Sequence, residues 1–87
     1  MLKKSIRISR AGGLEARSFA KLVQVASRFD SRIYMETETM RVNAKSIMGM
    51  MSLEPEQDEL ITISADGIDE QEAVMELEGF LVGKTDN

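Results

Sequence analysis

The spacing of apolar residues changes several times along this chain. In some segments they occupy every second position, which is typical of a strand, and in others they recur about every 3.6 residues, which is typical of a helix. Alternation at Ile6 and Ile8 predicts a half-buried first strand over residues 2–8, with Gly12 and Gly13 as the break that ends it. The other strands are predicted around Ile33-Tyr34-Met35, at Met40, Val42 and Ala44, and at Ile61, Ile63 and Ala65. Turns or breaks between elements are predicted at Asp30-Ser31, Glu38-Thr39 and Gly67.

Helical spacing predicts three helices between and after these strands. The first runs from Glu15 to Phe29, and a short apolar helix runs from Ser46 to Leu53 with Ser46 as its N-cap. The last begins in a variant of the capping box, with Asp69 as the cap and Glu72 as the third helical residue, and Gly83 can end it. The apolar stripes expected to face the core are Phe19, Leu22, Val23 and Ala26 in the first helix, and Ala73, Val74, Leu77, Phe80 and Leu81 in the last.

The resulting order, βαββαβα, predicts an α+β fold in a single domain over residues 1–87. Strands that alternate apolar and polar residues suit a sheet that is covered on one face only. We therefore expect an open-faced two-layer sandwich: a four-stranded antiparallel sheet with three helices on one face.

The residue types that are missing narrow the possible functions. The chain has no cysteine and no histidine, which removes disulfides, thiolate chemistry, the commonest general base and the commonest metal ligand. We predict no catalytic residue, no cofactor and no metal site. The net charge of −4 and the pI near 4.8 argue against general nucleic-acid binding. Without a long apolar run or a signal-peptide pattern, we expect a cytoplasmic protein that does not insert into membranes.

Charge is distributed unevenly along the chain. Residues 1–45 hold ten of the eleven basic residues and have a net charge of +6, whereas residues 46–87 have a net charge of −10. Such asymmetry can mark a basic docking face. The alternative, which we favour, is that elements from the two halves interleave in space and mix the signs.

Two short segments are candidate binding sites. Backbone N–H groups at the start of the first helix, in Gly13-Leu14-Glu15-Ala16-Arg17, can attract an anion, and Arg17 can add a bidentate contact. The alternative is that Glu15 only complements the helix dipole and that Arg17 is a solvated surface charge. In the segment 45–51, Met48, Met50 and Met51 cannot all face inward from so short a helix. At least one exposed methionine would suit a surface that meets several partners, whereas the alternative is that all of them fill gaps in a small core.

Several stretches resemble the HPr family, the small phosphocarriers of the bacterial sugar phosphotransferase system. The resemblance rests on residues 13–17, on the stretches Leu22-Val23-Gln24 and Ala26-Ser27, on Asn43 to Leu53 and on Ile61 to Ala73, and it covers nearly the whole chain. It implies the βαββαβα open-faced sandwich. The phosphocarrier has a histidine, which accepts a phosphoryl group from enzyme I, where this chain has Glu15, and a proline where it has Ser18. The carrier site, including Arg17, is thus degenerate here.

The resemblance is closest in kind to the regulatory Crh branch (catabolite repression HPr), which lacks the histidine and keeps the serine. It implies that Ser46 is phosphorylated by HPr kinase/phosphorylase and that the product is a corepressor of a LacI-type transcription regulator. Ile47, Met48 and Met51 would form the apolar docking patch, with Lys45 and Arg28 in its charged surroundings. Arg17 would contact the partner or the phosphoryl group across the short gap between the two helix ends.

Other functions remain as alternatives. Glu15 can imitate a phosphohistidine permanently, which would make the chain a standing mimic of the phosphorylated carrier. A small nucleic-acid-binding module or a small enzyme is the alternative from another class, but it lacks an aromatic stacking platform and suitable catalytic residues. For the oligomeric state we expect a monomer or a weak homodimer, because an open sheet edge permits strand exchange.

Overall fold

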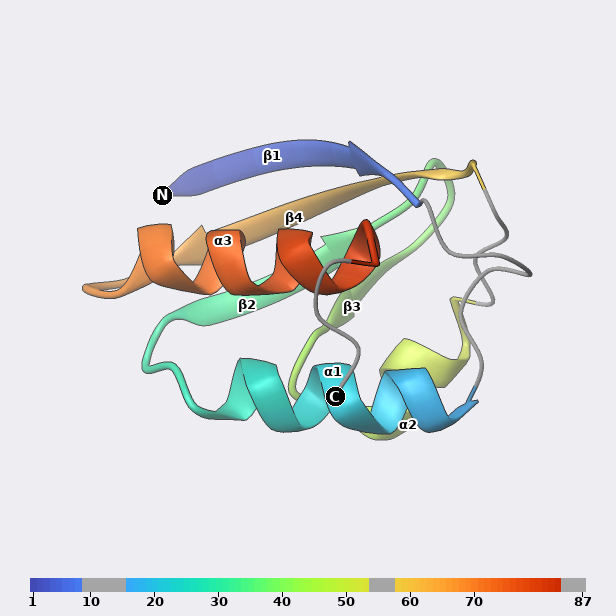
Figure 1. Ribbon diagram of the computed structural model, residues 1–87, viewed down its shortest axis with the longest axis horizontal. Coiled ribbons are helices and arrows are strands. Elements are labelled where there is room, and N and C mark those ends of the chain that lie inside the picture. Colours follow the sequence, from blue (N-terminus) through green and yellow to red (C-terminus); the bar gives the residue numbers. More distant parts are fainter. Residues whose placement is uncertain (9–15, 54–57, 84–87) are drawn as a thin grey trace.

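The computed structural model describes residues 1–8, 16–53 and 58–83, and these contain seven elements (Figure 1). In chain order they are β1 (Leu2–Arg7), α1 (Ala16–Ser27), β2 (Arg32–Glu36), β3 (Arg41–Asn43), α2 (Ile47–Met51), β4 (Leu60–Asp66) and α3 (Glu70–Leu81). The predicted βαββαβα order is confirmed. The predicted break at Gly12 and Gly13 lies outside the described residues.

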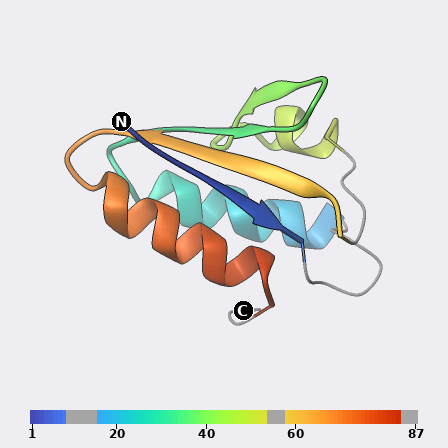
Figure 2. The same cartoon turned by 90° about the horizontal axis from the view of Figure 1, so that it is seen from above.

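The four strands form one sheet in the order β1-β4-β2-β3, and every neighbouring pair is antiparallel. Ile6 pairs with Ile61, and Met35 pairs with Ile63, so the apolar residues of three strands lie on the same face. The helices pack on that face, and the other face stays open (Figure 2). This confirms the predicted open-faced α+β sandwich.

The core lies between the sheet and the helices, and most of it follows the predicted stripes. All five predicted residues of α3 are buried, from Ala73 to Leu81. In α1, Leu22 and Ala26 are buried as expected, but Val23 is only partly buried and Val25, which the stripe did not include, is buried. Gly83 has a φ of 79°, a conformation that favours glycine, and it follows α3 as predicted.

Four predicted elements are shorter than expected. Strand β1 ends at Arg7 instead of Ile8, and helix α2 ends at Met51 instead of Leu53. Helix α1 ends at Ser27 instead of Phe29, because the N–H groups of Arg28 and Phe29 turn back to carbonyls three residues earlier. Strand β3 has only three residues. Met40, which we assigned to this strand, is exposed, and its backbone N–H donates to the Thr37 hydroxyl, which holds Met40 in the turn before the strand.

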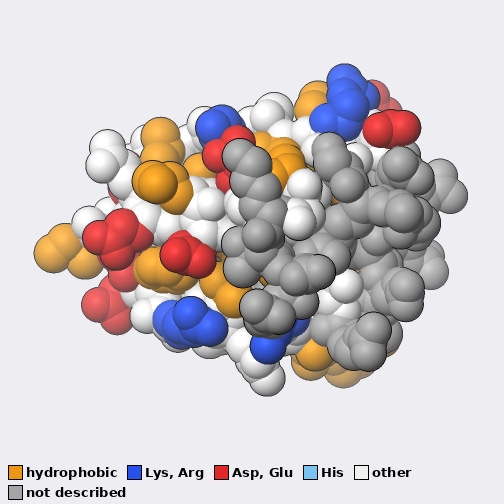
Figure 3. Space-filling model, in the orientation of Figure 1, with side chains coloured by type: hydrophobic (Ala, Val, Ile, Leu, Met, Phe, Trp, Pro, Cys, Tyr) orange, Lys and Arg blue, Asp and Glu red, His pale blue; other side chains and the backbone are white. Residues whose placement is uncertain are grey.

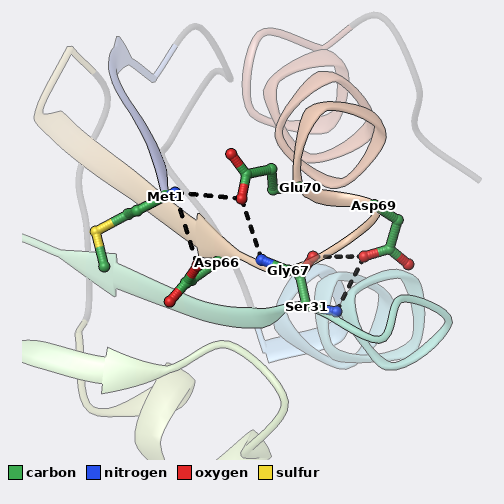
Figure 4. A network of polar contacts seen from close by, with 6 residues as sticks. All are labelled: Met1, Ser31, Asp66, Gly67, Asp69 and Glu70. Atoms are coloured by element: carbon green, nitrogen blue, oxygen red, sulfur yellow. Dashed lines mark hydrogen bonds and ion pairs between the residues drawn. The ribbon is translucent and has the colours of Figure 1, made fainter.

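The predicted positions at the start of α3 are confirmed, with Asp69 as the N-cap and Glu72 as the third helical residue, but the side-chain hydrogen bond of a capping box is not formed. The Asp69 carboxylate instead accepts a hydrogen bond from the Asp30 N–H at 2.8 Å. It also accepts from the Ser31 N–H at 3.0 Å and from the Ser31 hydroxyl (Figure 4). Glu70 closes the turn, because its carboxylate accepts from the Gly67 N–H at 3.1 Å. Asp69 thus ties the start of α3 to the turn before β2 rather than capping its own helix.

These bonds give a pH prediction. The Ser31 hydroxyl and the Asp30 N–H lower the pKa of Asp69 below its ordinary value of 3.8. A carboxyl whose pKa is lowered by folding stabilises the protein above its unfolded-state pKa, and that contribution is lost as the pH falls through the folded-state pKa. Asp69→Asn should therefore have a lower melting temperature than the parent near neutral pH, and the difference should shrink below about pH 4. Melting curves from pH 7 to pH 2 test this, and two parallel profiles would contradict it.

The two halves of the chain interleave, as the preferred charge interpretation predicts. Strand β1 from the basic half pairs with β4 from the acidic half, and the Lys4 ammonium lies 2.8 Å from the Glu78 carboxylate of α3. The N-terminal amino group lies 3.6 Å from the Asp66 carboxylate and 3.4 Å from that of Glu70. Opposite charges therefore meet along this side of the molecule. Within the described residues, no helix has the length and apolar character needed to cross a bilayer.

Candidate functional site

Ser46 begins helix α2, as the sequence predicts. Its backbone is extended, with φ −108° and ψ 115°, and its hydroxyl accepts a hydrogen bond from the Gly49 N–H at 3.2 Å. The side chain of Asn43 directs the chain into this helix, because its oxygen accepts from the Lys45 N–H at 2.8 Å. The Ser46 hydroxyl therefore lies half-buried at the N-terminus of α2.

The methionines of α2 divide between the core and the surface. Met50 is fully buried, whereas Met48 is 80% exposed and Met51 is 45% exposed. Ile47 is exposed beside them, and we call Ile47, Met48 and Met51 the α2 patch. Figure 3 shows hydrophobic side chains at the surface in this region, at the lower right. The prediction that at least one methionine is exposed is confirmed, and the core-filling alternative holds for Met50 alone.

Lys45 is held in place by the end of α1. Its ammonium donates to the Phe29 carbonyl at 2.6 Å, and its side chain is half-buried. Phe29 lies two residues beyond Ser27, the last residue of α1, at the end of the helix that attracts a cation. Lys45 therefore carries a fixed charge one residue before Ser46, while Arg28 lies exposed next to Phe29.

The helix in which the first candidate segment ends, α1, packs against α2. Both views place α2 next to the N-terminal half of α1 (Figures 1 and 2). Ser18 is half-buried in the first turn of α1. Glu15 lies outside the described residues, and so does the side chain of Arg17, although its backbone belongs to α1. Of the first candidate segment, residues 13–17, the structure describes only the backbone of Ala16 and Arg17, at the start of α1.

One hollow at the sheet edge has no signal in the sequence. A cavity of about 530 Å³ lies where the turn between β2 and β3 meets the start of β4, and its lining includes Glu36, Glu38 and Glu59. Strand register brings Glu36 opposite Thr62, and no local pattern reveals such a pairing. No group of His, Cys, Asp or Glu residues in the described ranges is arranged to hold a metal ion.

Comparison with models of protein families shows which family this chain belongs to. Residues 2–82 match the family model described as "PTS HPr component phosphorylation site". This chain belongs to the HPr family. Its relatives include the HPr-like protein Crh of Halalkalibacterium halodurans, which is 44% identical over 81 residues, 93% of this chain and 96% of the relative.

Solved structures of HPr-family proteins agree with this fold. The crystal structure of HPr from Thermoanaerobacter tengcongensis has a TM-score of 0.89 and 44% identity, covering 97% of this chain and 94% of that one. The crystal structure of Crh from Bacillus subtilis has a TM-score of 0.77 and 38% identity, covering 100% of both chains, and is described as a swapped dimer. HPr and Crh are phosphocarrier or regulatory proteins, not enzymes. The sequence identity of this HPr-family chain to Crh is similar to its identity to HPr, but the chain contains no histidine.

Proposed function

We propose that this HPr-family protein is a regulator of carbon catabolite repression, switched by phosphorylation of Ser46, and not a phosphocarrier. One observation carries the proposal: the chain has no histidine to carry a phosphoryl group, yet a serine caps α2 beside an exposed apolar patch. HPr kinase/phosphorylase would add the phosphoryl group in the cytoplasm. The product would act as corepressor of a LacI-type transcription regulator, without contacting nucleic acid itself. We treat residues 1–87 as one domain that is a monomer or a weak homodimer.

The local geometry suits such a switch. A phosphoryl group adds nearly two negative charges and several strong acceptor oxygens. At Ser46 these oxygens would face N–H groups of the first turn of α2, one of which, that of Gly49, already donates to the serine hydroxyl. We therefore expect the modified protein to keep its fold. What changes is the surface, because a partner with an arginine or lysine at this point gains charge-assisted hydrogen bonds.

The α2 patch would supply the contact area, and the phosphoryl group would supply the selectivity. Met48 and Met51 are flexible and adapt to partners of different shape. Arg17 and the fixed charge of Lys45 would complete the surface, and a partner that buries Met48 must carry cations to match the phosphoryl group. The degenerate carrier site at Glu15 and Ser18 takes no part in phosphoryl transfer in this proposal.

Titration calorimetry of the protein against a LacI-type regulator tests this mechanism. We expect the form phosphorylated on Ser46 to bind at least about tenfold more tightly than the unmodified form, because new charge-assisted bonds form at the interface. Met48→Asp should weaken the binding of the phosphorylated form. Equal affinity of the two forms would contradict the proposed switch.

A second candidate function is favoured by the carboxylate of Glu15, at the place where the resemblance puts the histidine of the carrier. The protein would then bind a phosphotransferase-system or regulatory domain as a permanent mimic of phosphohistidine HPr. Glu15→Gln should weaken that binding by about tenfold if the charge is needed. Unchanged affinity in the same titration would exclude the mimic and leave the Ser46 switch.

A further inference from the structure

The outer face of α3 exposes apolar residues that the fold does not use. Ile68 is 93% exposed in the turn before α3, and Met75 is 70% exposed within the helix. Ile68 and Glu72 line the same hollow at the start of α3. Met75 and Glu76 stand three and four residues after Glu72 within the helix, so the three lie on one side of it. Both glutamates are exposed. We call Ile68, Glu72, Met75 and Glu76 the α3 strip.

The two glutamates of the strip lack the partners that the other glutamates of α3 have. Glu70 lies 3.4 Å from the N-terminal amino group, and Glu78 pairs with Lys4 at 2.8 Å. Within the described residues, neither Glu72 nor Glu76 forms an ion pair. They stand four residues apart, where like charges repel each other, although Glu72 also lies in the first turn of α3, where a negative charge suits the helix dipole. Helix α3 contains no lysine or arginine that could pair with them. Two glutamates that repel each other thus stand on an exposed face, next to exposed apolar residues. Such an arrangement is expected where a surface binds a partner.

This surface is separate from the α2 patch. Helix α3 packs on β1, β4 and α1, whereas α2 packs on α1 and β3. Figure 2 shows α1 between the two helices, so the strip and the patch lie on different sides of the molecule. In Figure 3, acidic side chains lie over α3 and a hydrophobic side chain projects at its start, on the left.

We propose that the α3 strip is a second docking surface, which binds a basic amphipathic segment of a partner protein. Lysines or arginines of that segment would pair with Glu72 and Glu76, and its apolar residues would cover Ile68 and the adaptable Met75. Anionic membranes and nucleic acids do not fit, because the strip would repel their phosphates. Because the two surfaces are separate, this partner and a Ser46-dependent partner can bind at the same time.

Nuclear magnetic resonance and calorimetry with a synthetic helical peptide of lysines and leucines test the proposal on the full-length protein. Amide shifts should concentrate in residues 68–79. The double variant Glu72→Gln/Glu76→Gln should bind about tenfold more weakly. Its melting temperature should change little, because removal of the like-charge repulsion and loss of the Glu72 charge from the first turn of α3 have opposite effects. Met75→Ser should also weaken binding. Phosphorylation of Ser46 should leave the affinity unchanged.

Matched variants test whether peptide binding depends on the α3 strip itself or only on net charge or on exposed apolar side chains in general. Asp30→Asn/Glu38→Gln removes the same charge from exposed residues elsewhere, and Met48→Ser removes an exposed methionine from the α2 patch. Both should bind the peptide as the parent does. Equal loss in the two charge variants, shifts centred on α2, or tighter binding to anionic vesicles or to RNA than to the peptide would each overturn the proposal.

Discussion

Replacing Met50 by aspartate should strongly destabilise the protein. Met50 is fully buried where α2 meets the core, and the replacement would bury a carboxylate among apolar residues such as those of α1 and the sheet. The lost packing and the buried charge together should cost about 4 kcal/mol or more, out of the roughly 5–15 kcal/mol that stabilise a small domain. Thermal melting followed by circular dichroism should show a fall in melting temperature of about 20 °C or a loss of the transition.

Two variants make this test specific to burial. Met48→Asp places the same carboxylate two residues earlier, on a side chain that is 80% exposed, and should change stability by no more than about 0.5 kcal/mol. Met50→Leu keeps the volume and should cost less than about 1.5 kcal/mol. If Met48→Asp unfolds the protein and Met50→Asp does not, the division of the methionines between surface and core is wrong.

Gly67→Ala should destabilise the protein by about 2 kcal/mol, because it forces atoms into contact with backbone. A Cβ atom on Gly67 would lie 2.6 Å from the Cα of Ser31 and 2.6 Å from its hydroxyl oxygen. Ser31 cannot move freely, since its N–H and its hydroxyl both donate to Asp69 (Figure 4). The added methyl group therefore pushes against the contact that holds α3 to the turn before β2. In thermal melting, we expect a decrease of about 10 °C.

Gly49→Ala is the matched control. Its Cβ would lie 3.4 Å from the nearest atoms, the Ser46 hydroxyl oxygen and the Val42 Cβ, which is close to ordinary contact. Gly49 lies within α2, where alanine is favoured over glycine by up to about 1 kcal/mol. This variant should be as stable as the parent or more stable. Equal losses in the two variants would show that the approach of Gly67 to Ser31 is not the cause.

The elements could be predicted because each has a strong local pattern. The stripe of α3, the N-cap at Ser46 and the alternation of Ile61, Ile63 and Ala65 depend on spacing within a few residues. The residue at which β3 begins could not be predicted in this way. Met40 continues the alternation of Val42 and Ala44, but a hydrogen bond to Thr37 keeps it in the turn. Alternation alone does not tell where an edge strand begins.

Contacts between segments that are distant in the chain could not be predicted from the sequence. Asp69 has a sequence context typical of a helix cap, yet its carboxylate binds Ser31, which lies 38 residues earlier. Lys45 was interpreted as part of a charged docking surface, and its ammonium is held by the Phe29 carbonyl. In both cases a polar side chain near the start of one helix forms its hydrogen bond with a residue from a distant part of the chain. Such pairings depend on strand order and register, which the sequence pattern does not encode.

An intact-mass measurement tests the central claim most directly. The protein is incubated with HPr kinase/phosphorylase and ATP, beside a Ser46→Ala control and a parallel reaction with enzyme I and phosphoenolpyruvate. We predict the addition of one phosphoryl group by the kinase, none in the Ser46→Ala control and none with enzyme I, because the chain has no histidine. An unmodified protein after the kinase reaction, or a phosphoryl group transferred from enzyme I, would contradict the Ser46 switch.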